Sequence, residues 1–434
     1  MRSRAPGLLR RHHDFRLLWT GQTVSQFGSQ VTLLALPLVA IRQLHASTFA
    51  VGLLTTAEFA GFPLVGLPAG AWVDRMHRRP VLVAADVGRA LALASVPVAA
   101  MLDVLTMAQL YAVALVMGVL TVFFDVAYLS YLPALVGRDD LVDGNARLEM
   151  SRSTAQVAGP GLGGGLVQVM TAPYAVLVDA VSFVVSALSV GAIRGREGPL
   201  ERPPGGPRLR QEIGEGLRYV LGHPILRSLA VSVATFNLFS ATFDAVCVVF
   251  LARTLHLSAG VIGLLFTVSA LGSLTGAVLT GPISRRLGSA RTIWVAPLLT
   301  YPWFLLVPLT TRGVGLLLFV VGTVVAFAGT VVFNVGAVSF RQAICPPRLL
   351  GRMTASMRFL SWGTPPLGGL LGGWLGGRYG VRSALWVSSV GVLLSVPWLV
   401  WSPLRGMRDL PAADSLPLVE PEPRPVVLPG RQAE

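Results

Sequence analysis

The chain has 434 residues, of which 53% are hydrophobic and only 13% are charged. A soluble protein of this length would carry about a quarter charged residues, so we expect most of the surface to face lipid. The net charge of +14 alone would be compatible with a nucleic-acid partner, but the positions of the arginines argue against one. Because the chain has no lysine, a P-loop lysine and a lysine nucleophile are excluded, and transport driven by its own ATP hydrolysis is not expected.

Twelve apolar stretches are long enough to cross the hydrocarbon core of a membrane, which takes about 20 residues. The first follows a basic segment and is too long for the apolar region of a signal peptide, so we expect it to remain as a membrane helix. The sequence thus predicts an all-α membrane protein with no cofactor, no metal and no enzymatic activity. The predicted spans are 17–40, 49–72, 80–101, 107–130, 147–169, 173–193, 226–251, 258–281, 290–310, 313–336, 353–376 and 382–402.

The arginines alternate from loop to loop along this series of spans. Clusters precede span 1, follow span 12, and lie between spans 2 and 3, 4 and 5, 6 and 7, 8 and 9, and 10 and 11, whereas the other loops hold isolated arginines, including Arg42 and Arg253. Under the positive-inside rule, this asymmetry places both termini in the cytoplasm. It predicts a multi-pass protein of the plasma (inner) membrane and accounts for the net charge without nucleic acid.

Short motifs recur six spans apart. The segment 125–130 in span 4 resembles 334–339 in span 10, and Arg152 with the glycines of span 5 resembles Arg358 with Pro365 and the glycines of span 11. Parallel six-helix repeats are a known transporter plan, so we expect two pseudo-symmetric six-helix bundles. The predicted parts are an N-terminal bundle at 1–193, a cytoplasmic linker with an amphipathic helix at 194–225, a C-terminal bundle at 226–403 and a disordered cytoplasmic tail at 404–434.

The most specific motif follows span 2. Residues 70–79 read Gly-Ala-Trp-Val-Asp-Arg-Met-His-Arg-Arg, which resembles the Gly-x-x-x-Asp-Arg-x-x-Arg-Arg loop signature of the major facilitator superfamily. The resemblance covers the whole chain, with twelve spans, two halves and a long central loop, and it looks most like the macrolide and siderophore exporter branch of proton-coupled exporters. It implies the major facilitator fold and a gating loop that comprises Gly70, Asp74, Arg75, Arg78 and Arg79.

In that superfamily the loop aspartate, here Asp74, docks at the N-terminal end of span 11 when the cavity opens outward. A helix N-terminus attracts a carboxylate, and the arginines of the loop can bind lipid headgroups. In the second half Ser284 replaces the acid, so we expect asymmetric gating. The alternative is a loop that is basic only because it lies on the cytoplasmic side.

Span 5 contains a proline followed by several glycines, a combination that would break a soluble helix but that neighbouring helices can support in lipid. Glycines four residues apart form a flat strip, which permits close helix contact. The stretch also matches Gly-x-Gly-x-x-Gly, but the preceding segment is predicted to be helix rather than strand, which disfavours a dinucleotide site. Four residues resemble the antiporter signature of the superfamily, whose fold would pair span 5 with span 8 and span 2 with span 11: Gly159, Pro160, Gly163 and Gly164.

Polar residues keep to one face of spans 1, 4, 7 and 10, which line the central cavity in this superfamily. Buried amides are costly in lipid and are therefore expected to face such a cavity, although polar residues also join helices to one another. Aromatic residues beside them would suit a bulky, amphipathic cargo. The candidate substrate-cavity residues are Gln22, Gln26, Gln30, Asn237, Phe243, Phe327 and Asn334.

Carboxylates within the spans are candidates for proton coupling, because a lone acid in a membrane helix is costly while charged. Glu58 in span 2 and Asp244 in span 7 rank first, since neither has an arginine near it in its own span. Asp179 and Asp125 resemble acids of the exporter branch, so a structural role is equally open for them. Asp86 is expected to pair with Arg89, almost one helical turn away. The arginine-bearing signature that the superfamily carries on span 4 is absent here.

The sequence therefore predicts proton-coupled export of a hydrophobic or amphipathic small molecule by alternating access. We expect small molecules, protons and membrane lipids as partners, no nucleic acid, and a monomer. A dedicated siderophore or macrolide exporter is the close alternative. A membrane sensor or scaffold that transports nothing, and an uptake symporter, are alternatives of other kinds.

Overall fold

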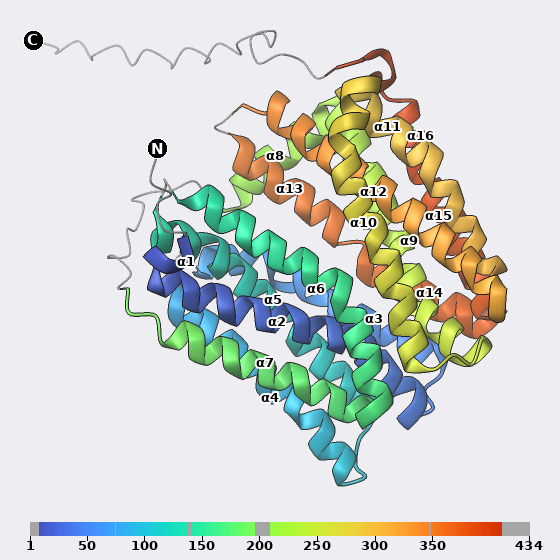
Figure 1. The fold of residues 1–434 in the computed structure, drawn as a ribbon. Helices are drawn as coiled ribbons and strands as arrows, with labels where there is room; N and C mark the ends of the chain where they lie inside the picture. Colours follow the sequence, from blue (N-terminus) through green and yellow to red (C-terminus); the bar gives the residue numbers. More distant parts are fainter. Residues whose placement is uncertain (1–7, 74, 138–139, 196–208, 347–348, 410–434) are drawn as a thin grey trace, which may run out of the picture.

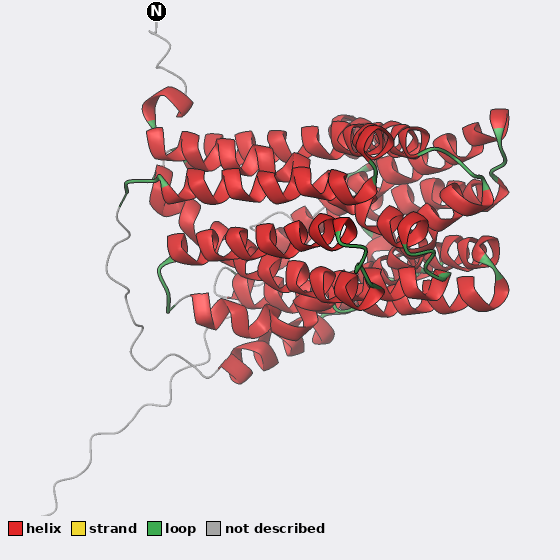
Figure 2. Ribbon diagram, turned by 90° about the horizontal axis from the view of Figure 1, so that it is seen from below, coloured by secondary structure: helices red, strands yellow, loops and turns green. Residues whose placement is uncertain are grey.

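A computed structural model describes residues 8–73, 75–137, 140–195, 209–346 and 349–409. Within these residues the chain is helical and contains no strand (Figure 2). The N-terminal half comprises α1 (Leu8–Arg11), α2 (His13–Leu38), α3 (Thr48–Val73), α4 (Arg78–Met101), α5 (Met107–Val136), α6 (Leu141–Met170) and α7 (Ala172–Gly191). A π-helical turn, η1 (Val39–Gln43), extends α2.

The second half begins after α8 (Leu209–Gly222) and repeats this plan with more breaks in the helices. Its elements are α9 (Pro224–Val249) with the π-helical turn η2 (Phe250–Thr254), α10 (Ala259–Leu287), α11 (Ser289–Thr300) with η3 (Tyr301–Leu309), η4 (Gly313–Gly315) with α12 (Leu316–Ile344), α13 (Leu350–Trp362), α14 (Pro365–Tyr379), α15 (Val381–Leu393), α16 (Ser395–Val400) and η6 (Pro403–Gly406). Figure 1 shows the two halves as separate bundles, blue to green and yellow to red.

Ten helices among the described residues are long and apolar enough to cross a membrane. The other two crossings are α6 and the pair α13–α14. The first half of α6 carries charged residues such as Arg147 and Arg152, which lower its hydropathy. The predicted continuous span 353–376 is wrong in one respect, because the helix is interrupted between Trp362 and Pro365. Two consecutive prolines lack the N–H groups that would continue the hydrogen-bond ladder.

The predicted helix pairs between the halves are confirmed. α6 packs along α10, and α3 packs along α14. Both contacts depend on glycine, because a Cβ added to Gly164 would lie 2.9 Å from the Cα of Gly263, and one added to Gly373 would lie 3.0 Å from the Cα of Gly52. Backbones this close leave no room for a side chain, as expected for small-residue interfaces between membrane helices.

These contacts lie toward one end of the molecule. The loops at residues 44–47 and 255–258 belong to that end, which we call the closed end, whereas α1 and α8 lie at the opposite end, which we call the open end (Figure 1). Hydrogen bonds between the halves include Gly260 N to Gln168 Oε1 at 3.0 Å, beside the loop at 255–258. The two bundles are thus joined at the end remote from α1 and α8.

The connector helix α8 packs against α13 of the second half. Its Glu215 pairs with Arg352, Val220 is fully buried, and the Tyr219 hydroxyl donates to the carbonyl of Ile344 at 3.2 Å. The helix is therefore fixed to the second bundle, in addition to any contact with the membrane surface.

Part of the predicted disordered tail is ordered. Residues 404–409 continue from η6 and cover the start of α11, where Asp409 Oδ1 accepts a hydrogen bond from Ser289 N at 3.0 Å. A carboxylate at a helix N-terminus satisfies a free N–H group and opposes the helix dipole. The prediction of disorder is wrong for this segment, and the rest of the tail lies outside the described residues.

Candidate functional site

A cavity of about 630 Å³ occupies the first bundle. It extends along α6 from Asn145, close to the open end, and along α2 as far as Leu36. The second bundle contributes only Arg358 and Trp362 of α13 to the described lining. The cavity is therefore accessible from the open end and nearly all of its wall belongs to one half.

The predicted polar face of α2 lines this cavity. Gln22, Gln26 and Gln30 all belong to the wall. Gln22 is 7% exposed, and its Nε2 has no hydrogen-bond partner among the described residues. A buried amide that lacks a protein partner is costly unless water or a ligand satisfies it. This row of amides thus offers hydrogen bonds to a bound molecule on the α2 side of the cavity.

The other predicted cavity residues are placed differently. Asn237 donates from Nδ2 to the carbonyl of Ser361 at 2.8 Å, which satisfies a backbone oxygen close to the break between α13 and α14. Asn334 is exposed and does not belong to the described wall of the central cavity. Both amides therefore lie apart from the row on α2.

The predicted aromatic residues belong to the second bundle. Phe243 and Phe327 pack on either side of Phe304, with ring centroids 5.8 and 6.0 Å away. Together with Asp244 they border a second, much narrower cavity. Edge-on aromatic packing of this kind fills a helix bundle, so these rings occupy the space in the second half that is open in the first.

The predicted pair of Asp86 and Arg89 is confirmed, and it is the centre of a larger group. The guanidinium of Arg89 lies between the rings of Phe124 and Phe183, at 4.4 and 4.2 Å from their centroids. Asp86 is fully buried, and Arg89 is 5% exposed and reaches the cavity wall. Cation–π contacts and a paired carboxylate together make a buried arginine tolerable.

Two of the predicted proton-coupling acids adjoin this arginine. Asp179 accepts hydrogen bonds from Thr32 at 2.6 Å and from Ser182 at 2.9 Å, and it lines the cavity together with Asp125. The charge of Arg89 acts on both acids. Sequence reasoning identified the acids, and it named Arg89 as the partner of Asp86, but it did not predict that the charge of Arg89 also acts on Asp125 and Asp179. An arginine in the middle of an apolar span is itself a signal, because such a charge is retained in a membrane only with partners.

The two acids ranked first lie on opposite sides of the contact between the halves. Glu58 on α3 lines the central cavity, and Asp244 on α9 borders the narrow one. Asp244 is the charged group that acts most strongly on Glu58, and neither has a salt bridge among the described residues. Like charges without a counterion favour uptake of a proton or a cation.

The gating loop is described only in part. Asp74 lies outside the described residues, so its predicted contact with span 11 does too. Gly70 has open space around its Cα, Arg75 is exposed, and Arg78 and Arg79 begin α4. Arg79 donates to the carbonyl of Gly191 at the end of α7, which connects this loop to the sixth membrane helix.

The antiporter-type residues form the joint between α2, α6 and α10. A Cβ at Gly163 would lie 3.1 Å from the Cα of Val31 on α2, and the Gly164 contact with Gly263 lies on the α10 side. Gly159 and Pro160 are buried in the same helix. The strip is therefore a two-sided packing surface between the first helix and the opposite bundle.

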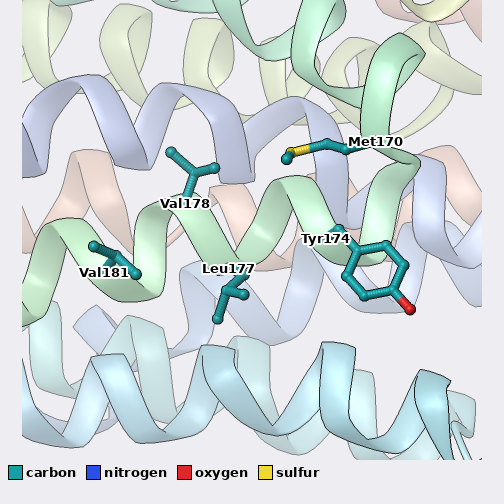
Figure 3. Close-up of a pocket in the computed structure, with 5 residues that line it drawn as sticks. All are labelled: Met170, Tyr174, Leu177, Val178 and Val181. Carbon is teal, nitrogen blue, oxygen red and sulfur yellow. The ribbon is translucent and has the colours of Figure 1, made fainter.

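An apolar hollow of about 380 Å³ lies on the outer face of α7, bordered by residues from Met170 to Val181 (Figure 3). Tyr174 and Leu177 are each 40% exposed there. No polar side chain other than the tyrosine lines it, so it matches lipid-facing surface. Among the described residues, no group of His, Cys, Asp and Glu could hold a metal ion.

Comparisons with known proteins agree with this architecture. The chain matches the family described as transmembrane secretion effector, a family of major facilitator transporters, over residues 5–428. It is 28% identical over 401 residues to the multidrug efflux pump Tap of Mycolicibacterium fortuitum, covering 88% of this chain and 94% of that protein. It is 25% identical over 414 residues to the enterobactin exporter EntS of Salmonella choleraesuis, covering 93% and 96%.

A solved structure shows the same fold. The nucleoside transporter NupG superposes with a TM-score of 0.71 at 12% identity, over 89% of this chain and 98% of that one. The twelve membrane helices in two six-helix bundles and the match along nearly the whole chain lead to one conclusion. The chain belongs to the transmembrane secretion effector family of the major facilitator superfamily, a family of efflux and secretion transporters rather than enzymes.

Proposed function

We propose that this protein exports hydrophobic or amphipathic small molecules across the plasma membrane by alternating access, driven by proton entry. The observation that carries the proposal is the cavity of about 630 Å³, which is accessible from the open end and combines acids, amides and aromatic rings. Apolar walls with a few polar groups suit amphipathic ligands. Both termini lie at the cytoplasmic side under the positive-inside rule, so the cavity is open to the cytoplasm in this conformation.

We assign proton coupling to the acids of the two cavities. Glu58 and Asp244 lie close enough to repel each other when both are charged, so protonation of one is favoured. Asp179 and Asp125 share the charge of Arg89. A proton that enters these sites from outside would neutralise an acid that the cargo otherwise contacts. Release of cargo and uptake of a proton would then be linked at one site.

Alternating access requires the two halves to rock about their joint. The glycine contacts of α6 with α10 and of α3 with α14 provide flat surfaces that can slide. The loop with Asp74 would dock on the start of α13 when the open end closes, and lipid headgroups would hold its arginines. A monomer contains every part of this proposed cycle.

A dedicated exporter of one oxygen-rich natural product, such as a siderophore or macrolide, is a second candidate. It is favoured by two buried donors on the cavity wall that lack partners among the described residues, Gln22 Nε2 and Arg89 Nε. Such donors match carbonyl or hydroxyl oxygens of a cargo. Protection of cells against one chemical class only would identify this case, whereas protection against several classes would identify broad export.

The test uses inside-out vesicles that contain a pH-sensitive dye and are energised to acidify the lumen. Addition of amphipathic compounds should release protons in the wild type, Glu58→Gln should abolish that release, and Asp244→Asn should move its pH dependence. Asp103→Asn, in an exposed loop at the closed end, is the matched control and should behave as the wild type. Compound uptake into the vesicles without any proton release would contradict the coupling. No uptake of any compound by the wild type would instead favour a sensor or scaffold.

A further inference from the structure

Two loops at the closed end share an unusual conformation. The first helix of each half ends in a π-helical turn, η1 and η2. Each turn is followed by a histidine with a φ of 47°, His45 in one half and His256 in the other. Residues other than glycine rarely adopt a positive φ. The same conformation at equivalent places in both halves therefore indicates a feature that the repeat has retained.

Each π-helical turn carries an arginine at its fourth position, and each arginine contacts the other half. Arg42 Nη2 donates to the carbonyl of Leu257 at 3.2 Å, and Arg253 Nη2 donates to the carbonyl of Ile41 at 3.2 Å. Neither guanidinium has a carboxylate partner in the part of the chain that the structure describes. The two hydrogen bonds are thus reciprocal, charge-assisted and directed at backbone carbonyls across the joint.

We propose that Arg42 and Arg253 form a reciprocal latch that holds the closed end shut and releases when the cavity opens there. The proposal rests on the alternating access proposed above. Both acceptors are backbone carbonyls, whose positions move with their own half, so rocking of the halves must break both bonds together. A charged donor makes such a bond stronger than a neutral one, whereas exposure to water weakens it. The latch can therefore bias the equilibrium and still release in each cycle.

Two other arginines at the closed end form hydrogen bonds within one half and therefore do not join the two halves. Arg382 Nη2 donates to the carbonyl of Thr310 at 3.1 Å, and Arg312 Nε donates to the carbonyl of Leu255 at 2.7 Å. Both bonds lie within the second half, so rocking leaves them intact. Arg382 thus provides a matched control, with the same donor, the same type of acceptor and the same end of the molecule.

Distances between spin labels across the closed end test the latch directly. Spin labels would be attached to cysteines at Val104, in the loop after α4, and at Val314, in η4 of the other half, which are 60% and 82% exposed. The background is a variant whose buried Cys247 and Cys345 are replaced by alanine. The variants are Arg42→Gln, Arg253→Gln, their combination, and Arg382→Gln. No cargo is needed for the measurement.

We expect the combined variant to raise the ratio of long to short distances about tenfold, which corresponds to about 1.4 kcal/mol. Each single variant should raise it less, because one bond remains, and Arg382→Gln should leave it unchanged. An unchanged distribution in the combined variant, or an equal shift in Arg382→Gln, would overturn the latch. If the combined variant fails to fold, the two single variants decide by the same criterion.

The vesicle assay separates this proposal from the proposed function. If the wild type exports compounds and the distances in the arginine variants are unaltered, the latch proposal is wrong and the proposed export function stands. If the distances shift in the arginine variants but no compound is exported, the latch proposal stands and the proposed export function is wrong. Arg42→Lys with Arg253→Lys retains both charged donors and should keep the wild-type distances, so a shift there would also count against the latch.

Discussion

The two bundles share one helix plan but use their interiors differently. The first bundle encloses the cavity, with Asp125 and Asp179 beside Arg89. At the position that corresponds to Asp125 the second bundle has Asn334, which is exposed, and its interior is filled by packed aromatic rings around Phe304. The repeat thus fixes where helices lie, whereas side-chain volume and charge decide which half keeps an open, charged cavity.

The largest expected effect comes from breaking the buried ion pair of Asp86 and Arg89, which has no equivalent among the described residues of the second bundle. Arg89→Met leaves the carboxyl of Asp86 fully buried and without its partner, which should destabilise the protein by about 3–5 kcal/mol. Thermal unfolding of the purified protein in detergent measures this loss. Arg89→Met combined with Asp86→Asn should recover much of it.

The control for that prediction is Arg152→Met. Arg152 pairs with Glu149 at 3.1 Å, but both side chains are more than half exposed in the protein, so the expected loss is at most about 1 kcal/mol. Equal destabilisation by the two substitutions would show that the buried group around Arg89 has no special role in the first bundle.

The next effect concerns the joint at which the bundles meet. Gly164→Val places a branched side chain against Gly263 of the opposite half, where backbone atoms leave no space. We expect transport in vesicles to fall at least about tenfold while the helices still insert. Gly165→Val is the matched control on the same turn, since nothing lies within 4 Å of a Cβ built there. Similar losses in both variants would mean that the strip tolerates no β-branched residue for reasons unrelated to the joint.

A smaller effect distinguishes Glu58 on α3 and Asp244 on α9, two acids that belong to opposite halves. Asp244→Asn removes the negative charge that acts on Glu58, so Glu58 should release its proton more readily and the pH profile of transport should move to lower pH. Asp409→Asn, at the exposed open end, serves as the control. An unmoved profile for Asp244→Asn would show that the second bundle takes no part in proton binding.

The smallest effect tests the polar row on α2 against Asn334, an exposed amide on α12 of the second bundle. Gln22→Leu replaces a buried amide on the cavity wall, and the affinity for an oxygen-bearing cargo should fall about fivefold, as for one lost hydrogen bond. Asn334→Leu, at an exposed position away from the described cavity wall, should change the apparent KM little. Equal changes would indicate that the cargo contacts both bundles alike.

The closed and open ends add a second contrast. At the closed end the halves are held by glycine contacts and by Arg42 and Arg253, whereas at the open end α8 and residues 404–409 are fixed to the second bundle alone. The connector and the start of the tail thus move with one half. When the bundles rock, the connector and the start of the tail change position relative to the first bundle but keep their contacts with the second bundle.

Much of this protein was determined by its sequence alone. Apolar stretches of the length of a membrane fix the number of crossings, since a backbone in lipid must satisfy its own hydrogen bonds. Glycines every four residues predicted a close helix contact along α6, because only the absence of side chains permits such an approach, and the resemblance to the superfamily implied span 8 as the partner. The pair of Asp86 and Arg89 followed from spacing within one helix.

Only the tertiary structure showed which residues from distant segments of the chain lie near one another. Spacing along one helix could not show that Asp125 and Asp179 come from separate helices to one arginine, or that Phe243 and Phe327 fill the second bundle instead of lining the large cavity. The same holds for the arginines at the closed end, whose acceptors are backbone carbonyls more than two hundred residues away. Backbone acceptors leave no mark in the sequence, because every residue has one.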